Sequence, residues 1–489
     1  MNTELLNLEP KEVWKNFVEL TKIPRPSKKE AAIIKFMENW AEERGLEHFT
    51  DEVGNVIIKK PATPGYENRK GIILQGHLDM VPQKNNDVEH DFEKDPVTAY
   101  VDGEWVTAKG TTLGADNGMG VAAAMAVLES KDIEHGPIEA LMTIDEETGM
   151  TGAFNLKPGL LDGDILMNLD SEDEGELYIG CAGGIDVTAY LKYKKSKVPG
   201  NHKAFKITVT GLKGGHSGVD IPLQRGNANK IMFRFLHNIS RKFKTRLASI
   251  SGGDMRNAIP REAVAIITVH ENDTEKFEKY AAEFNKIVKE ELKIVDPDVT
   301  VNIEETSAPE FVIQNKTAKK LYKLIRATPH GAQRFLDEMP EIPETSTNLG
   351  IVKSENGKII AANLVRSSVD SAKDALAQDI KALYRLAGAK VELSGEYPGW
   401  KPNFDSPILA AMKKSYNEKY GKIPEVKIIH AGLECGVLGA TYPNWDMISF
   451  GPTIRFPHSP DEKVHIESVA KFWDFLKETL KNVPEKELQ

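Results

Sequence analysis

Three carboxylates stand together at residues 145–147, where the apolar run LMTIDEETGM turns abruptly acidic. The run is typical of a buried strand, so these carboxylates are expected at a strand end. Neighbouring carboxylates can bind a divalent cation or move a proton during hydrolysis. Two acids after a strand are, however, more often a solvated turn or the start of a helix. Other polar residues at strand ends are needed to decide between these interpretations.

Further His and Asp residues follow other predicted strands. GIILQGHLDM ends with His77 and Asp79, and a spacing of two puts both side chains on one face of an extended chain. Asp116 lies between glycines before an Ala-rich helix, Asp170 ends the run ILMNLD, and His458 follows the last strand. In open α/β sheets, ligands bind at the carboxyl ends of strands. We therefore expect these groups to meet.

Each position has a simpler explanation when taken alone. His77 is compatible with a hydrogen-bonded structural histidine, and Asp116 with a helix cap. The acidic run after Asp170 is compatible with a solvent-facing segment, and His458 with an exposed ring in a Pro-rich loop. The combination favours a site for two metal ions, because four strand ends each supply one or two His or carboxylate groups. No compact motif such as HExxH is present, so the spacing alone is a moderate signal.

The elements that would position these groups alternate between helix and strand. Residues 28–45 have helical apolar spacing, and GNVIIKKP and GIILQGHL are typical of short strands. The basic stretch KYKKSKVPGNHK interrupts this pattern, which resumes near residue 396. We predict an α/β catalytic domain made of residues 1–186 and 396–489, with an α+β domain of residues 187–395 inserted. The inserted domain could contain two similar halves.

Composition narrows the classes of function. A chain of 489 residues is expected to form two or three domains. No apolar run approaches the roughly 20 residues that cross a bilayer, and the acidic N-terminal stretch does not resemble a secretion signal. Cys181 and Cys435 cannot form a disulfide framework, so we expect a cytoplasmic protein. The net charge of −10 argues against nucleic-acid binding.

Six stretches resemble a known superfamily. GHLDMV, GADNGMG, DEETGM, NLDSEDEG, GGHSGVD and HAGLECG are similar to motifs of the co-catalytic zinc peptidases, which include carboxypeptidase G, aminoacylase and carnosinase-type dipeptidases. Within that superfamily the chain most resembles the bacterial aminoacyl-histidine dipeptidases, in similar order and over nearly its whole length. The resemblance implies a mixed-sheet catalytic domain of zinc-peptidase type with an inserted α+β lid domain.

The resemblance also implies a set of metal ligands. One ion would be held by His77, Asp116 and Asp170, and the other by Asp116, Glu147 and His458, so that Asp116 bridges. Two zinc ions fit this set best, although manganese or cobalt suit the same oxygen-rich positions.

Two more residues near these ligands have implied roles. Glu146 matches the general base, and Asp79 matches the residue that steadies the imidazole of His77. The resemblance assigns no role to Asp145. It also implies a cis peptide bond between Asp116 and Asn117.

The inserted domain would complete the site. His216 in GGHSGVD matches a residue that stabilises the oxyanion, although a turn residue is an alternative. Arg366 is suggested as a clamp on the substrate carboxylate, and a solvated strand residue is an equal alternative. His430 and Glu434 lie in a predicted pocket loop, residues 430–439, and are candidates for binding the substrate's ends. His216 could act within its own chain, and a homodimer stays open.

The activity implied is hydrolysis of unblocked dipeptides, including those with C-terminal histidine such as carnosine. Related alternatives are an aminoacylase-like deacylase and a tripeptidase, which would use the same metal site. A non-catalytic metal-binding or peptide-binding protein is the third alternative. Glu146 beside the full ligand set disfavours it, because a protein that only binds needs no base. The expected partner is a small dipeptide, with no nucleic acid and no membrane.

Overall fold

The computed structural model describes residues 4–486 and divides the chain into two compact units. The first unit contains the described residues up to Gly180, Pro402–Ile428 and those from Leu433 onward. The second contains Cys181–Lys401 and Ile429–Gly432. The second unit is therefore inserted into the first, and a short later segment returns to it.

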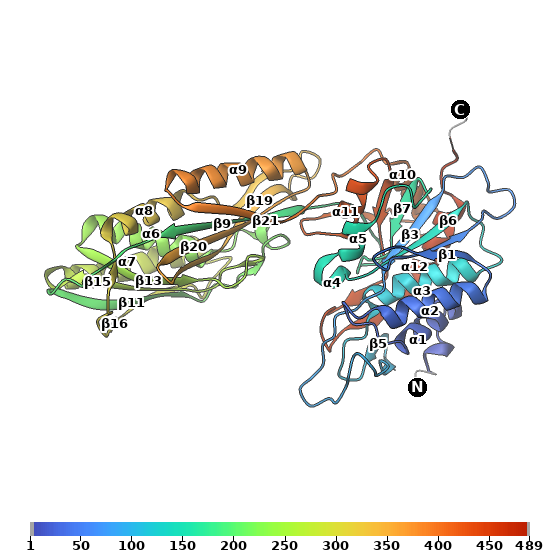
Figure 1. Cartoon of the computed structure of the whole chain (residues 1–489), viewed down its shortest axis with the longest axis horizontal. Helices are drawn as coiled ribbons and strands as arrows, with labels where there is room; N and C mark the ends of the chain where they lie inside the picture. Colours follow the sequence, from blue (N-terminus) through green and yellow to red (C-terminus); the bar gives the residue numbers. More distant parts are fainter. Residues whose placement is uncertain (1–3, 487–489) are drawn as a thin grey trace. The chain divides into compact units, whose positions relative to one another are not determined.

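An eight-stranded mixed sheet forms the centre of the first unit (Figure 1). Its strands are, in spatial order, β1 (Glu47–Thr50), β2 (Val56–Lys60), β6 (Ile138–Thr143), β3 (Ile72–His77), β7 (Ile165–Asn168), β23 (Asp446–Ser449), β8 (Glu176–Cys181) and β22 (Glu425–Ile429). The neighbours β6, β3, β7 and β23 run parallel, so their carboxyl ends share one edge of the sheet. A mixed α/β fold is thus confirmed, as are the two strands predicted near residues 56–60 and 72–77.

Helices cover this sheet. They are α1 (Lys11–Thr21), α2 (Ala31–Glu43), α3 (Ala115–Glu129), α4 (Glu146–Gly149), α5 (Thr151–Asn155), α10 (Pro407–Tyr420), α11 (Glu434–Thr441) and α12 (Ile466–Lys481). Figure 1 shows α3 on one side of the strands and α10 on the other. A smaller sheet has the order β24 (Ile454–Arg455), β25 (Lys463–His465), β5 (Trp105–Ala108) and β4 (Ala99–Asp102).

Local sequence explains where the predicted helices begin and which face they bury. In α2, Ile33, Met37 and Trp40 are buried, and their spacing of four and three puts them on one helical face. In α10, the Ser406 side chain accepts a hydrogen bond from the Leu409 backbone N–H, and Gly421 ends the helix with a left-handed φ of 68°. None of the helices in the described part of the chain has the length and apolar character needed to cross a membrane.

The second unit is built on a nine-stranded sheet. Its order is β16 (Thr300–Thr306), β11 (His202–Thr210), β15 (Ala263–His270), β13 (Thr245–Gly252), β19 (Pro343–Glu355), β20 (Lys358–Ser367), β9 (Gly183–Lys192) and β21 (Lys390–Tyr397), with β18 (Gly331–Phe335) paired to β19. The helices α6 (Ala228–Lys242), α7 (Thr274–Leu292), α8 (Asn315–Ala327) and α9 (Asp370–Leu386) contribute to one continuous apolar core with the strands. Two short pairs are β12 (Gly215–His216) with β14 (Ala258–Ile259), and β10 (Lys195–Ser196) with β17 (Val312–Ile313).

Candidate active site

The carboxyl ends of the four parallel strands bring the predicted ligands of the first unit together. β3 ends at His77, β6 leads into Glu146 and Glu147, β7 leads into Asp170, and β23 leads toward His458. Asp116 comes from the first turn of α3, where the peptide bond to Asn117 is cis, as the resemblance implied. Residues separated by almost four hundred positions therefore meet because their strands are neighbours.

The Asp116 carboxylate lies between the two histidines. Its Oδ1 is 3.1 Å from His77 Nε2, and its Oδ2 is 3.2 Å from His458 Nε2. Asp170 Oδ1 lies 3.4 Å from His77 Nε2, and Glu147 Oε2 lies 2.9 Å from His458 Nε2. Two triads result, His77 with Asp116 and Asp170, and Asp116 with Glu147 and His458, and each has its ligand atoms within 4.8 Å of one another. Asp116 is the member that both triads share.

These groups fit a pair of divalent cations. Glu147 Oε1 is buried, and no described residue donates a hydrogen bond to it. Burial raises the pKa of Asp170 to about 7, an effect that His77 opposes and the Asp116 carboxylate reinforces. For Asp116 burial acts in the same direction, but hydrogen bonds with His458 and His77 hold its pKa well below the usual range. Crowded, buried carboxylates beside imidazole nitrogens form a donor set of the kind that binds zinc.

Asp79 connects the end of β3 to the start of α4. Its Oδ1 lies 3.4 Å from His77 Nδ1 and accepts the Glu146 N–H at 3.0 Å. Its Oδ2 accepts the Glu147 N–H at 3.3 Å and the Ser27 hydroxyl at 2.8 Å. Burial tends to raise the pKa of Asp79, but its interactions with His77 lower it to about 2. His77 Nδ1 also lies 3.1 Å from the backbone carbonyl oxygen of Asp79. Asp79 thus orients the imidazole through both its carbonyl and its carboxylate, and the carboxylate fixes the backbone of both glutamates.

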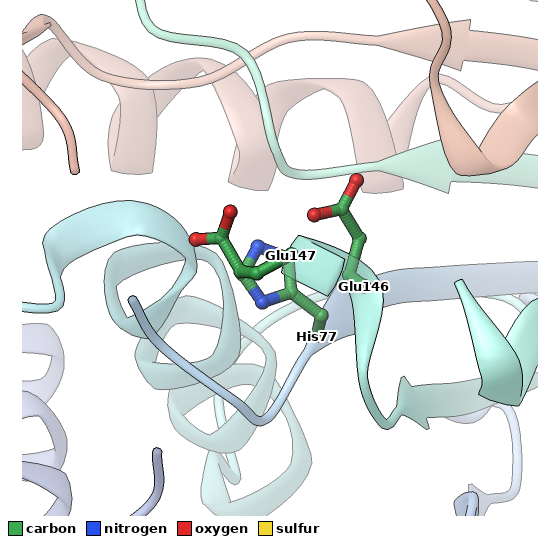
Figure 2. Close-up of side chains that lie close together, drawn as sticks. All are labelled: His77, Glu146 and Glu147. Carbon is green, nitrogen blue, oxygen red and sulfur yellow. The ribbon is translucent and has the colours of Figure 1, made fainter. Parts of the chain in front are cut away.

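Glu146 lies beside the ligands without belonging to the two triads that share Asp116. Figure 2 shows the Glu146 side chain close to Glu147 and to the His77 ring. Burial raises the pKa of Glu146 well above its ordinary value; His77 opposes this rise, and the charges of Asp170 and Glu434 add to it. Glu146, His77 and Glu147 also bring ligand atoms within 4.8 Å of one another. A carboxylate that lies beside the two triads without belonging to them is available to exchange protons with water.

Asp145 shapes the turn that leads into the two glutamates. Its backbone is left-handed, with a φ of 52°, and its carboxylate accepts hydrogen bonds from the hydroxyls of Thr148 and Thr151. Its N–H donates to Glu30 Oε1 at 3.2 Å. The carboxylate of the first of the three acids therefore binds side chains of α4 and α5, which the sequence did not indicate.

Glu434 is a buried group of the first unit. Its Oε2 accepts hydrogen bonds from Gln75 Nε2 at 2.6 Å and Thr143 Oγ1 at 2.7 Å, while no described residue donates to the buried Oε1. Burial raises its pKa to about 7, against the opposing effect of His77. The prediction of a loop at 430–439 is wrong in its second part, because α11 begins at Glu434. The sequence did not indicate this helix because Gly436 and Gly439 lie within it, and glycine is a poor helix former.

His216, Arg366 and His430 all belong to the second unit. His216 Nδ1 accepts the backbone N–H of Gly218 at 3.3 Å and of Val219 at 3.2 Å, which places the ring proton on Nε2. This Nε2 lies 3.3 Å from Arg366 Nη2, so two donors face the same space. Burial and the Arg366 charge lower the pKa of His216, which favours the neutral ring.

His430 has a different environment. Its Nε2 lies 2.7 Å from Ser346 Oγ, and burial, aided by Arg366 and His216, lowers its pKa to about 3. The His430 ring is therefore neutral, with its Nε2 already paired to a protein hydroxyl.

The fold and the shared aspartate define a peptidase of the dinuclear metal type, and comparison with known proteins gives the family. Residues 73–482 match the model of peptidase family M20/M25/M40, and the chain belongs to this family. The chain is 46% identical to the cytosol non-specific dipeptidase of Escherichia coli (strain K12), over 99% of this chain and 100% of that protein. The crystal structure of aminoacylhistidine dipeptidase from Vibrio alginolyticus is similar with a TM-score of 0.94 and 48% identity, covering 99% of this chain and 98% of that one. Aminopeptidase PepT from Bacillus cereus shares the fold at a TM-score of 0.57 and 18% identity.

Two residues with central positions were missed by the sequence analysis. Glu462 is buried and accepts hydrogen bonds from the backbone N–H groups of residues 113–116, and the Tyr397 hydroxyl accepts one from Arg366 Nη1. Glu462 stands in the polar stretch SPDEKV, which is typical of a solvated loop. Tyr397 stands before a Pro-Gly turn, where the sequence offered no signal of a buried contact.

Proposed function

We propose that this peptidase hydrolyses unblocked dipeptides, including those with C-terminal histidine, and that it uses two zinc ions. The observation that carries the proposal is the pair of triads that share Asp116. His77, Asp116 and Asp170 would hold one ion, and Asp116, Glu147 and His458 the other. When bound, such ions supply an acidified water and stabilise developing negative charge.

In this proposal Glu146 is the general base. Its carboxylate would take the proton of the attacking water and later pass it to the leaving amine. Asp79 keeps the His77 imidazole oriented and accepts hydrogen bonds from the N–H groups of both glutamates. The backbone positions of Glu146 and Glu147 are therefore fixed relative to His77. Neutral His216 would donate its Nε2–H to the oxyanion of the tetrahedral intermediate.

Substrate ends are assigned to three other groups. Arg366 would bind the C-terminal carboxylate, because no described carboxylate pairs with its guanidinium. Glu434 would bind the amino end, since its buried Oε1 has no donor among the described residues. His430, whose Nε2 lies 2.7 Å from Ser346 Oγ, is the third group that would bind the substrate's ends. An unblocked peptide has the free carboxylate that Arg366 would bind and the free amino group that Glu434 would bind.

The names of the similar proteins support the same substrate class. One is called a non-specific dipeptidase and the other an aminoacylhistidine dipeptidase, and both match this chain over nearly its whole length. The word cytosol in the first name supports the cytoplasmic location that we expect from the sequence.

The test is substrate discrimination with removal and return of metal. Purified protein is assayed for free histidine released from beta-alanyl-histidine, and for hydrolysis of an N-acetyl amino acid and a tripeptide. We expect rapid release of histidine, loss of activity with a chelator and recovery with zinc. Preferred cleavage of the N-acetyl amino acid or the tripeptide would assign the site to a deacylase or a tripeptidase instead. Activity that survives complete metal removal would contradict the proposal.

A further inference from the structure

Two hydroxyl groups hold the Arg366 guanidinium in the second unit, and His216 lies beside it. Its Nε donates to Ser217 Oγ at 3.2 Å, its Nη1 donates to Tyr397 Oη at 2.8 Å, and its Nη2 lies 3.3 Å from His216 Nε2. The residue is 4% exposed. The guanidinium is therefore almost enclosed by groups that carry no negative charge.

This arrangement leaves Arg366 ready to bind an anion. A guanidinium has five N–H donors, and the hydrogen bonds to Ser217 and Tyr397 use one hydrogen each of Nε and Nη1. Asp186 is the neighbouring acid, but its Oδ2 accepts from Arg256 Nη1 at 3.0 Å. A buried cation without an ionic partner is costly, and a carboxylate bound in bidentate fashion would offset that cost.

Tyr397 is itself fixed by close packing. A Cβ placed on Gly184 would lie 2.6 Å from the Tyr397 ring, and one placed on Gly432 would lie 3.1 Å from it. Both glycines therefore let the backbone approach the ring more closely than other residues would. The ring therefore lies against the backbone at both positions.

The backbone of Tyr397 is anchored as well. Its carbonyl accepts a hydrogen bond from Lys373 Nζ at 3.1 Å, and Lys373 is 1% exposed. Lys373 is held by Asp370 at 3.1 Å and Glu396 at 3.3 Å. The first turn of α9 thus fixes the backbone at the end of β21, which carries the Tyr397 hydroxyl that contacts Arg366.

We propose that Tyr397 is the positioning residue of the carboxylate clamp. Its hydroxyl holds Nη1, so that the remaining N–H groups of Arg366 face a substrate carboxylate in one orientation. Tyr397 would thereby set the preference of the enzyme for peptides with a free C-terminus. This inference rests on the proposed function of Arg366 as the clamp.

The test compares a dipeptide with its C-terminal amide. Steady-state kinetics are measured on the zinc-loaded wild type and on Tyr397→Phe with beta-alanyl-histidine and beta-alanyl-histidinamide. Loss of a hydrogen bond to a charged group predicts an increase of about tenfold or more in KM for the free acid. We expect kcat to stay within about twofold and the KM for the amide to change by less than about twofold, because the amide cannot use the clamp.

Control variants separate this inference from the proposal on which it rests. Arg366→Ala, or Arg366→Lys if the alanine variant unfolds, should abolish the preference for the free acid, and Tyr397→Phe should then add nothing in that background. Tyr190→Phe is a matched control, because Tyr190 pairs with Ile360 while Gly184 pairs with Arg366, six positions away on β9. It should leave the acid-to-amide ratio unchanged.

Each result has a distinct meaning. An unchanged ratio in the Arg366 variant would overturn the clamp itself. An altered ratio in the Arg366 variant but not in Tyr397→Phe would overturn the role of Tyr397 alone. Equal losses with both substrates, or a fall in kcat without a change in KM, would show that Tyr397 has only a structural role. Thermal unfolding of each variant checks that the fold is retained.

Discussion

Glu462 holds the backbone of Asp116. The N–H of Asp116 donates to Glu462 Oε1 at 3.2 Å, and the same oxygen accepts the Ala115 N–H at 2.8 Å. The other oxygen accepts from Leu113 at 2.7 Å and Gly114 at 2.9 Å. One buried carboxylate therefore satisfies four consecutive backbone donors next to the residue that would bridge the metals.

Glu462→Gln should weaken metal binding. The amide loses the charge and presents one oxygen instead of two, so at least two of the four N–H groups lose an acceptor. Substitutions that disturb the support of a metal ligand typically reduce metal affinity by about 10–100-fold. Competition with a chromogenic zinc chelator measures this directly, without an activity assay. Unchanged affinity in a folded variant would show that the loop is held by other contacts.

Glu146 and Glu147 should behave in opposite ways although they are adjacent. Glu146→Gln should keep its metal and lose kcat by about 10²–10⁴-fold, because a general base typically contributes that much. Glu147→Gln should lose metal, because Glu147 is the ligand beside His458. Metal content after gel filtration, measured with kcat on the same samples, checks both. Normal turnover in Glu146→Gln would refute its assignment as the base.

Asp145 should matter for the stability of the α4 turn. Asp145→Ala removes the acceptor of the Thr148 and Thr151 hydroxyls and places alanine at a φ of 52°. The left-handed conformation alone costs about 1–2 kcal/mol for an ordinary residue, whereas Asn adopts it readily. Urea unfolding should therefore show a larger loss for Asp145→Ala than for Asp145→Asn. Equal losses would contradict the role of the backbone conformation.

His430 gives the protein a specific sensitivity to acid. Its pKa is about 3 in the folded protein, chiefly because of burial, and about 6.5 in an unfolded chain. The unfolded state then binds the extra proton between these values. The stability contributed by neutral His430 is complete above pH 6.5 and is lost as the pH falls toward 3.

The variant His430→Asn should lack this pH dependence. Between pH 7.5 and pH 5 the wild type should lose about 2 kcal/mol of unfolding free energy more than the variant does. Urea titrations of both proteins at the two pH values measure the difference. Parallel losses in both proteins would show that His430 is not the group responsible.

The positions of the metal-binding candidates could be predicted because strand ends are visible in a sequence. Apolar runs that stop at His77, Glu147 and Asp170 indicate side chains at one edge of a parallel sheet, and the structure places them there. The α/β architecture followed from the alternation of helix and strand, and the mixed sheet from the resemblance. The resemblance added the pairing of these ligands into two triads.

The supporting residues could not be predicted for a physical reason. Glu462 is separated from Asp116 by 346 positions, and its partners are backbone N–H groups, which have no signature in the side-chain pattern. The contact between Tyr397 and Arg366 depends on the close approach of Gly184 and Gly432 to the ring, which only the folded chain reveals. Asp145 was ambiguous because its partners, Thr148 and Thr151, lie within a short turn.

The shared use of Asp116 is tested most directly by locating the metals. Crystals grown with zinc, with diffraction recorded on both sides of the zinc absorption edge, would show each bound ion as an anomalous peak. We expect two peaks, one among His77, Asp116 and Asp170 and the other among Asp116, Glu147 and His458. A single peak, or two peaks that do not both contact Asp116, would contradict the dinuclear site.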